Sequence, residues 1–352
     1  MSEPPTSHDN LVHLEHEYEL ENLKEVEREH SAHRHSHITI HSSYLVLLLS
    51  FVFFSILGTC IRLGLLAVFA YSDSPVASIV YPQIVGCAII GFVNVYKSEI
   101  TVGYYPLYIG LTTGLCGSIT TFSSWSLATF KSFMSPSPGI GYQIASFLAL
   151  IVSTIAMSLI SADFGRHVGE AAGPLLYKKR RSPFIGVNMA PRTWLPKELA
   201  VLDAFFLVLA LASIGTSISL GFWNSPHSDL MWALVLSPLG TLLRFHLSVL
   251  NSRMPAFPLG TFIANMIGTG VIAALYLYSA SIAGSCTLVH GIANGFCGCL
   301  TTISTWIVEL KTIPSITKAY IYGLASTVGG QILLVLIAGS PLLFRPHGSE
   351  CL

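Results

Sequence analysis

Long apolar segments constrain this sequence more than any other feature. Blocks of about 20 residues, almost free of charge, recur along the chain, and a helix of that length crosses the hydrocarbon core of a bilayer. Hydrophobic residues make up 52% of the chain and charged residues 10%, whereas about a quarter of the residues of a soluble domain are charged. The sequence therefore predicts an all-α polytopic membrane protein.

Apolar runs bounded by charged, Pro-rich or Gly-rich breaks predict nine membrane spans. The spans are approximately 44–70, 80–96, 105–130, 140–162, 199–222, 230–250, 258–280, 285–310 and 317–340. Outside them we expect a tail at 1–43, a basic cytoplasmic loop at 163–198 and a C-terminal tail at 341–352.

The basic residues of the loops predict the orientation of the chain. Lys97, the 178–181 cluster, Arg253, Lys311 and Lys318 all fall on one side of the nine spans. The opposite loops contain a single basic residue, Lys131. The positive-inside rule then predicts a cytoplasmic N-terminus, and the odd number of spans predicts an extracellular C-terminus. We expect no cleaved signal peptide, because no basic region, apolar core and cleavage site follow one another near residue 1.

The acidic tail 1–43 also contains eight of the 13 histidines. A metal-binding tract is one interpretation, and a disordered, solvated tail is the one we favour because the histidines lack a fixed ligand spacing. The seven cysteines form no CxxC pair. We interpret them as small packing residues and expect no disulfide framework.

One polar, glycine-rich segment occurs twice in the chain. Residues 110–125 read GLTTGLCGSITTFSSW, and residues 291–306 read GIANGFCGCLTTISTW. Further matches precede and follow these segments in the same order. They pair Arg62 with Arg244, Gly91 with Gly268, and the YQIAS segment at Tyr142 with the YGLAS segment at Tyr322.

These matches predict two four-helix repeats, at 44–162 and 223–340, joined by a transmembrane helix at 199–222. Four spans return the chain to its starting side, and the joining helix makes the second repeat enter from the other side. We therefore expect two antiparallel repeats related by an axis in the membrane plane.

The repeated polar segment predicts a broken helix in each half. Its glycines and its Ser and Thr hydroxyls weaken helical hydrogen bonds, and a break frees carbonyls that protein, water or an ion must satisfy. Close packing of small residues is the simpler alternative. Two breaks meeting at the midplane would direct carbonyl oxygens at one position, which suits a cation.

Charged groups inside the spans are few. Arg62 and Arg244 lie within predicted helices, either to attract an anion into a vestibule or to cap carbonyls near a helix end. Asp203, Asp229 and Glu309 lie near predicted span ends, so we expect no proton relay and favour passive conduction over coupled transport. No catalytic, nucleotide-binding or metal-ligand motif is recognisable, and we do not expect an enzyme.

The motifs GFCGCLTTISTW, GLCGSITTFSSW and LGTFIANMIG together resemble those of the Fluc/FEX fluoride exporters. The resemblance extends over roughly 44–340. It implies an anion channel with two pores and a structural sodium ion at its centre. The sodium ligands of the family are backbone carbonyls, which correspond here to Gly117, Thr120, Gly298 and Thr301.

The resemblance also implies a set of pore residues. The second-helix Asn of the family corresponds to Asn265 in the second half and to Ala88 in the first. The first Phe of the third helix corresponds to Phe122 in the first half and to Ile303 in the second. The second Phe corresponds to a tryptophan in both halves, Trp125 and Trp306. The implied pore residues are Asn265, Phe122, Trp306, Thr121, Tyr142, Ser146, Tyr322 and Ser326. Independently of the resemblance, the antiparallel halves would place Arg62 and Arg244 toward opposite sides of the membrane, where each would draw an anion into a vestibule.

The expected function is passive, fluoride-selective export that confers fluoride resistance, through one working pore and one degenerate pore. Fluoride and the lipid membrane are the expected partners. We expect neither a nucleic acid nor an obligatory protein partner, and the plasma membrane is the expected location. The alternatives are a proton-coupled small-solute transporter, which needs an intramembrane carboxylate, and a non-transporting scaffold, which tolerates apolar residues at Asn265, Thr120 and Thr301.

Overall fold

The computed structural model describes residues 44–71, 74–134, 139–177, 196–223, 228–281 and 286–339, and these residues form helices and connecting turns without a strand. The predicted tails at 1–43 and 341–352 lie outside the described residues, as does Ser340 at the end of the second predicted repeat. Tyr44 is also where the compact unit of the chain begins.

The described residues of the first half form a series of helices with a π-helical segment in the middle. They are α2 (Tyr44–Val68), α3 (Val80–Val95), α4 (Lys97–Ile109), η1 (Gly110–Cys116), α5 (Gly117–Ile119), α6 (Phe122–Met134) and α7 (Ile140–Tyr177). The helix α8 (Pro196–Trp223) follows.

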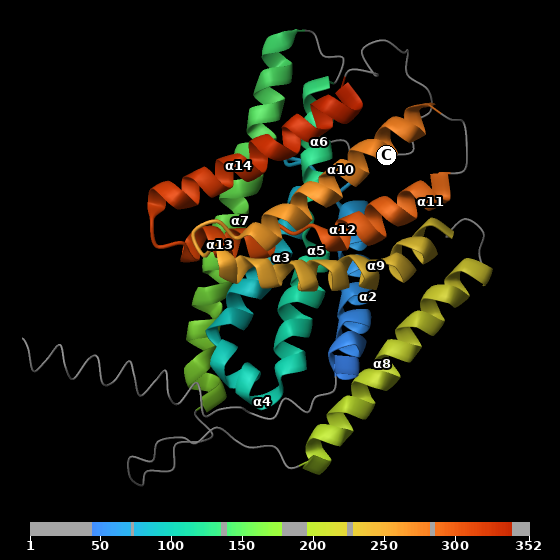
Figure 1. Cartoon of the computed structure of the whole chain (residues 1–352), viewed down its shortest axis with the longest axis vertical. Coiled ribbons are helices and arrows are strands. Elements are labelled where there is room, and N and C mark those ends of the chain that lie inside the picture. The colour runs from blue at the N-terminus through green and yellow to red at the C-terminus, as the bar shows by residue number, and fades with distance from the viewer. Residues whose placement is uncertain are drawn as a thin grey trace, which may run out of the picture. The chain divides into compact units, whose positions relative to one another are not determined.

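The second half has the same order of helices. They are α9 (Ser228–Ser248), η4 (Val249–Arg253), α10 (Leu259–Ser281), α11 (Cys286–His290), η5 (Gly291–Cys297), α12 (Gly298–Leu300), α13 (Ser304–Thr312), α14 (Ile316–Leu334) and η6 (Val335–Gly339). In Figure 1 the orange and red helices α9–α14 lie across the blue and green helices α2–α7.

Length and composition give seven candidate membrane spans among the described residues, or eight if α3 and the α4–α6 segment count as one bent span. These two segments meet at an angle of 111°, and α3 has only 16 residues. The number of nine spans therefore stays a prediction, although a helix occupies each of the nine predicted segments.

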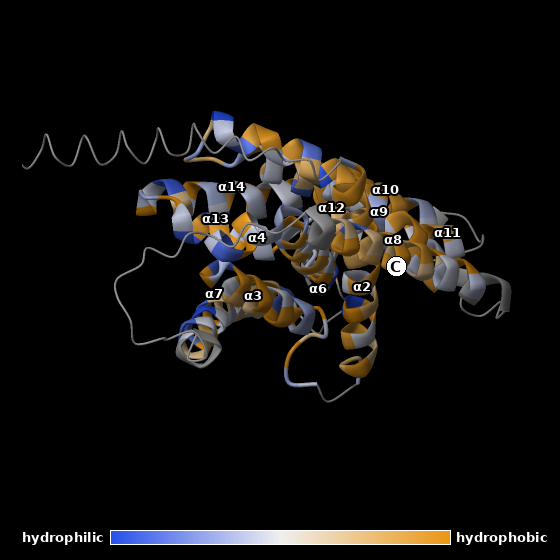
Figure 2. Ribbon diagram, turned by 90° about the horizontal axis from the view of Figure 1, so that it is seen from below, coloured by the Kyte–Doolittle hydropathy of each residue, from blue (hydrophilic) through white to orange (hydrophobic). Residues whose placement is uncertain are grey.

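The helices differ in which surface they bury. In the most apolar 18-residue stretch of α7 and of α8, only 17% of the residues are buried, whereas 61% are buried in the corresponding stretch of α11–α13. Large apolar side chains such as Val152, Ile160 and Leu211 are exposed on α7 and α8, and apolar residues cover most of the helices in Figure 2. The outer helices thus present a lipid-compatible surface around a more polar centre.

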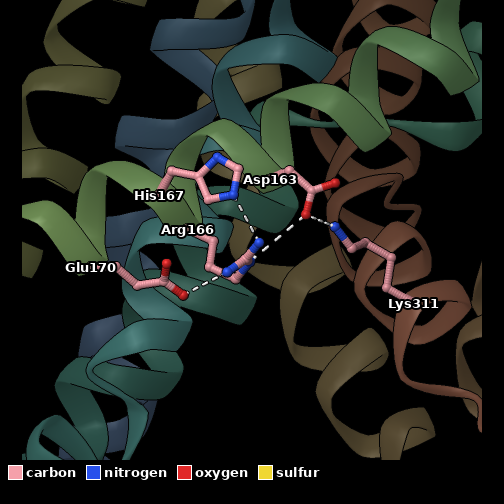
Figure 3. Close-up of polar contacts among 5 residues, drawn as sticks. All are labelled: Asp163, Arg166, His167, Glu170 and Lys311. Carbon is pink, nitrogen blue, oxygen red and sulfur yellow. Dashed lines mark hydrogen bonds and ion pairs between the residues drawn. The ribbon is translucent and has the colours of Figure 1, made fainter.

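The helix α7 is longer than the sequence predicts. We expected a loop from residue 163, and the helix instead continues to Tyr177. Ion pairs along one face support this extension, because Arg166 lies 3.8 Å from Asp163 and 2.6 Å from Glu170. Asp163 also pairs with Lys311 of α13, and Arg166 contacts His167 (Figure 3). The rest of the predicted loop, 178–195, lies outside the described residues.

Four of the seven cysteines follow the prediction, whereas Cys60 is free but exposed and Cys351 lies outside the described residues. Cys87, Cys116, Cys297 and Cys299 are buried and free, in keeping with packing residues. Cys286 is disulfide-bonded, which corrects the expectation that all seven serve only for packing.

Candidate functional site

Each of the two repeated polar segments contains a broken helix. Thr120 separates α5 from α6 with an extended backbone (φ −92°, ψ 149°), and Thr301 follows α12 in the same conformation (φ −92°, ψ 154°). Each hydroxyl donates a hydrogen bond to a carbonyl of the preceding turn, Cys116 at 3.0 Å or Cys297 at 2.9 Å. This local bond competes with the helical backbone pattern and favours the break at threonine.

The two broken helices cap each other. The hydroxyl oxygen of Thr301 accepts hydrogen bonds from the amides of Phe122 and Ser123, both at 3.1 Å. In the reciprocal contact, the Thr120 hydroxyl oxygen accepts from the amides of Ile303 and Ser304 at 3.3 and 3.1 Å. Each repeat therefore supplies the N-terminal cap of the other repeat's helix.

Two side-chain amides bridge the same breaks from α3 and α10. The Gln83 oxygen accepts from the Thr121 amide at 3.2 Å, and its nitrogen donates to the Thr121 carbonyl at 3.2 Å. Asn265 makes the same pair of bonds with Thr302, at 2.9 and 3.3 Å. Gln83 is thus the structural counterpart of Asn265.

The expected pairing of Asn265 with Ala88 is therefore wrong. Gly86 and Gly268 occupy equivalent positions, because a Cβ at either would overlap the methyl group of the threonine at the break, Thr120 or Thr301. We had paired Gly268 with Gly91, which instead lies against the carbonyl of Ala162 in α7. Several glycines in one helix made the alignment ambiguous.

Because of these caps, the backbone carbonyls just before each break lack the amide donors that they would have in a continuous helix. In a continuous helix, the amides of residues 121–124 would bond the carbonyls of residues 117–120. They bond Gln83, Thr301 and Thr121 side chains instead. The amides of residues 302–305 are diverted in the same way, to Asn265, Thr120 and Thr302.

The freed carbonyls include all four expected sodium ligands, Gly117, Thr120, Gly298 and Thr301. Oxygen atoms that have lost their hydrogen-bond donors suit a hard cation such as sodium. The hydroxyls of Thr120 and Thr302 lie 3.1 Å apart, as do those of Thr121 and Thr301, so the two breaks are in direct contact. The residues present therefore fit the cation that the resemblance implies.

Arg62 and Arg244 are buried, 1% and 4% exposed, in contact with these segments. Arg244 donates to the Thr113 carbonyl of η1 at 2.6 Å, and Arg62 donates to the Asn294 carbonyl of η5. This geometry favours the second of the two interpretations, carbonyl capping, over a position in an open vestibule.

Each arginine also lies against a glycine of the opposite repeat. A Cβ at Gly117 would overlap the guanidinium of Arg244, and one at Gly298 would overlap that of Arg62. Only glycine leaves space for these side chains next to the breaks. The two guanidiniums thus lie against the glycines that begin α5 and α12.

Phe122, Trp125 and Trp306 form an aromatic cluster next to the breaks. Each is at most 1% exposed. The ring of Phe122 meets Trp125 and Trp306 edge-on, at centroid distances of 5.2 and 5.7 Å. The structure thus brings the predicted residues Phe122 and Trp306 together and joins them to Trp125.

Tyr322 contacts the carboxylate of Glu309, which the sequence did not predict to be part of the site. Its hydroxyl donates to Glu309 at 2.7 Å, and Thr261 donates to the other Glu309 oxygen at 2.6 Å. Asn251 donates to that same oxygen at 3.0 Å. Glu309 is therefore a half-buried carboxylate near the end of α13, held by three hydrogen bonds from other parts of the second half.

The predicted residues of α7 do not correspond to those of α14. Tyr322 and Ser326 are buried, whereas Tyr142 and Ser146 are exposed on the outer surface. Buried residues recur every fourth position from Leu150 in α7 and from Tyr322 in α14. Aligning these first buried residues pairs Thr154 with Ser326 and Ser158 with Gly330. The YQIAS and YGLAS match was therefore a coincidence of composition.

The family model described as CrcB-like protein, Camphor Resistance (CrcB), matches residues 49–165 and again residues 231–339. The chain belongs to the CrcB-like family. Each matched region contains one complete broken helix and the threonine at its break, so the family unit occurs twice in this chain.

Curated relatives of this CrcB-like chain are known in fungi and bacteria. "Fluoride export protein 1" of Neurospora crassa is 33% identical over 82% of this chain and 65% of its own length, which is just under two thirds. "Fluoride export protein 1" of Schizosaccharomyces pombe is 30% identical over 82% of this chain and 94% of its own. "Fluoride-specific ion channel FluC 2" of Staphylococcus haemolyticus is 40% identical over 29% of this chain and 89% of its own. No solved structure matches the chain.

Proposed function

We propose that this CrcB-like chain is a fluoride-selective channel that lets fluoride leave the cell passively and so confers fluoride resistance. The names of its fungal and bacterial relatives support this function. One structural observation carries the proposal: two broken helices cap each other inside an apolar shell and surround a buried polar centre. Packing alone does not require so many polar groups within a membrane.

The physical logic favours a passive route. Fluoride enters acidic surroundings as neutral HF and dissociates in the more alkaline cytoplasm. An inside-negative membrane potential then drives the anion outward. The plasma membrane is accordingly the proposed location, with the N-terminus inside and the C-terminus outside.

The proposed architecture has nine spans, in which α8 joins two antiparallel four-helix repeats. Equivalent hydrogen bonds in the two repeats support it. They are made by Thr120 and Thr301, by Gln83 and Asn265, and by Arg62 and Arg244. Such pairs are expected when two copies meet across a twofold axis.

We also propose that a sodium ion binds the freed carbonyls of Gly117, Thr120, Gly298 and Thr301. When bound, it would supply positive charge that holds the two breaks together beside the anion path. The diverted amides of residues 121–124 and 302–305 support this assignment. We do not assign the ion a part in fluoride transfer.

The proposed working path is the one that Asn265 borders, with Phe122, Trp306, Tyr322 and Ser326 alongside. Five polar or aromatic residues along this path have aliphatic counterparts at the equivalent positions of the other repeat. The pairs are Phe122 and Ile303, Ser126 and Ile307, Glu309 and Ala128, Thr261 and Ile79, and Tyr322 and Leu150. A dehydrated anion needs donors, so we propose that the path beside Gln83 is degenerate, although it retains an amide.

Fluoride efflux from liposomes tests the channel and its asymmetry together. We expect wild-type protein to release fluoride far faster than chloride. Asn265→Asp places a negative charge beside the proposed working path, so we expect efflux to fall at least tenfold. The matched variant Gln83→Glu places the same charge beside the other path and should leave efflux near the wild-type rate. Equal efflux by both variants would contradict the asymmetry.

Glu309 makes the proton-coupled alternative testable, because it supplies the carboxylate that such a transporter needs. A passive channel should reverse its current at the fluoride equilibrium potential, with or without a pH gradient across the bilayer. A reversal potential that shifts with the pH gradient would favour coupled transport. Glu309→Gln should then abolish that shift.

A further inference from the structure

Cys286, the first residue of α11, is disulfide-bonded. The chain contains seven cysteines. Five of the others carry free thiols in the described part of the chain: Cys60, Cys87, Cys116, Cys297 and Cys299. Cys351 is the one cysteine that remains, and it lies outside the described residues. Within a single chain, Cys351 is therefore the only partner available to Cys286.

The segment α11–α13, which begins at Cys286, runs antiparallel to α10. Glu309, near the end of α13, accepts a hydrogen bond at 2.6 Å from Thr261, the third residue of α10. The segment therefore ends where α10 begins. It starts five residues after Ser281, the last residue of α10. Cys286 thus follows the C-terminal end of α10.

The helix α14 runs alongside α10 in the same direction as α10. A Cβ built at Gly329 of α14 would lie 3.2 Å from the sulfur of Met266. Further along both helices, a Cβ built at Gly270 would lie 4.0 Å from Cδ1 of Ile337 in η6. The chain therefore advances toward the C-terminal end of α10 as it reaches Gly339, the last described residue.

The C-terminal tail is long enough to bring Cys351 to Cys286. Twelve residues follow Gly339 up to and including Cys351, and an extended chain of that length spans about 40 Å. A disulfide requires the two Cα atoms to approach to about 4.4–6.8 Å. Because the tail and α11 both start from the same end of α10, this bond is compatible with the described helices.

We propose that Cys286 and Cys351 form an intramolecular disulfide on the extracellular side, which joins the start of α11 to the C-terminal tail. Disulfides form and persist outside the reducing cytoplasm. The basic residues of the loops place the same end of α10 outside, and that pattern is independent of the cysteines. The inference goes beyond fluoride conduction and does not depend on it.

Formation of the bond oxidises two thiols, and an oxidised dithiol oxidoreductase of the secretory pathway is the class of oxidant required. The thiolate of one cysteine attacks the disulfide of the oxidoreductase, and the thiolate of the other then attacks the mixed disulfide. The new S–S bond forms within the chain. The oxidoreductase leaves as a dithiol, with the two electrons and the two protons.

The bond closes a covalent loop in the second half of the chain. A crosslink of this kind restricts the unfolded chain and so stabilises the folded one. The first repeat has no equivalent, because the offset of 181 between Gly110 and Gly291 places Tyr105 opposite Cys286. The loop contains three residues of the proposed working path: Trp306, Tyr322 and Ser326.

Peptide mapping of the full-length chain tests the pairing. The protein is purified without reductant, denatured in an alkylating reagent and digested. We expect one linked pair of peptides, containing Cys286 and Cys351, which separates on reduction, and alkylation of the other five cysteines. Alkylation of Cys286 before reduction would overturn the pairing, as would a disulfide-linked dimer on a non-reducing gel.

Thiol labelling of intact cells tests the side of the membrane. In the variant Cys351→Ser, Cys286 becomes a free thiol, and we expect a membrane-impermeant maleimide to label it from outside. Wild-type Cys286 should be labelled only after treatment with a membrane-impermeant reductant. Labelling of the variant that requires permeabilised cells would place Cys286 inside and contradict the proposal.

Thermal melting in detergent measures the contribution of the bond to stability. We expect Cys286→Ser and Cys351→Ser to lower the melting temperature by the same amount, and the double variant to lower it no further, because each change removes the same crosslink. Cys60→Ser, which removes a free thiol, is the control. Losses that add in the double variant would refute a shared bond.

Fluoride efflux from liposomes separates this inference from the proposed function. A chain that carries the linked peptides and passes no fluoride would refute the channel and leave the disulfide standing. A chain that passes fluoride with Cys286 and Cys351 both free would leave the channel standing and refute the disulfide.

Discussion

Thr120 and Thr301 each connect two helices through one hydroxyl. The Thr301 oxygen accepts amide bonds from Phe122 and Ser123, while its proton goes to Cys297 in its own repeat. Few side chains could do this, because the residue must both donate and accept within a small space. The repeated TT pair in the sequence therefore reflects the contact between the two breaks.

Replacing this hydroxyl should destabilise the protein. Thr301→Val keeps the shape of the side chain and leaves two buried amides without an acceptor, so we expect a loss of about 2 kcal/mol or more in stability. Thr301→Ser keeps the hydroxyl and is the control. Thermal melting in detergent measures both, and a Val variant as stable as the Ser variant would contradict the capping role.

Sequence reasoning identified most of these residues but missed Glu309 and Gln83. The repeated motif was enough to find Thr120, Thr301, Phe122 and Trp306, because the order of glycines and hydroxyls is a local signal. Glu309 joins the site only through hydrogen bonds from Thr261 and Tyr322, which come from other helices. A sequence pattern within one helix does not contain that information.

At the scale of helices, α3 and α7 approach each other through small residues. A Cβ at Gly165 would overlap the carbonyl of Ala88, and one at Gly91 would overlap that of Ala162. Close backbone contact of this kind is how small residues join helices in a membrane. It also fixes the register of α7, which is why Leu150, Thr154 and Ser158 face the interior.

This contact predicts opposite effects for two glycine substitutions. Gly165→Ala should push α7 away from α3 and cost about 1–3 kcal/mol in stability. Gly215→Ala in α8, where no atom lies within 4 Å, should be neutral or stabilise by up to about 1 kcal/mol. Melting temperatures of the two variants check this, and equal effects would argue against the close approach.

The helices themselves were predictable, but their register was not. Apolar length located every helical segment because the bilayer imposes it. The pairing of Tyr142 with Tyr322 and of Gly91 with Gly268 failed because Ala, Gly, Leu and Ser recur in any membrane helix. The end of α7 was misplaced because charged residues end a membrane span but not a helix.

At the scale of the whole molecule, the proposed sodium ion should stabilise the contact between repeats. A ligand that binds only the folded state raises its stability with concentration. We therefore expect the wild type to melt at a higher temperature in sodium chloride than in N-methylglucamine chloride of equal ionic strength. An identical melting temperature in both salts would remove the support for a sodium site.

The exchange of caps also has a consequence for how the protein is made. The amides of Phe122 and Ser123 enter the bilayer when the ribosome has not yet made residue 301, so their acceptor does not exist at that time. The amides of Ile303 and Ser304, by contrast, are made after their acceptor, Thr120. The amides of the amino-terminal copy therefore lack this acceptor until residue 301 has been translated.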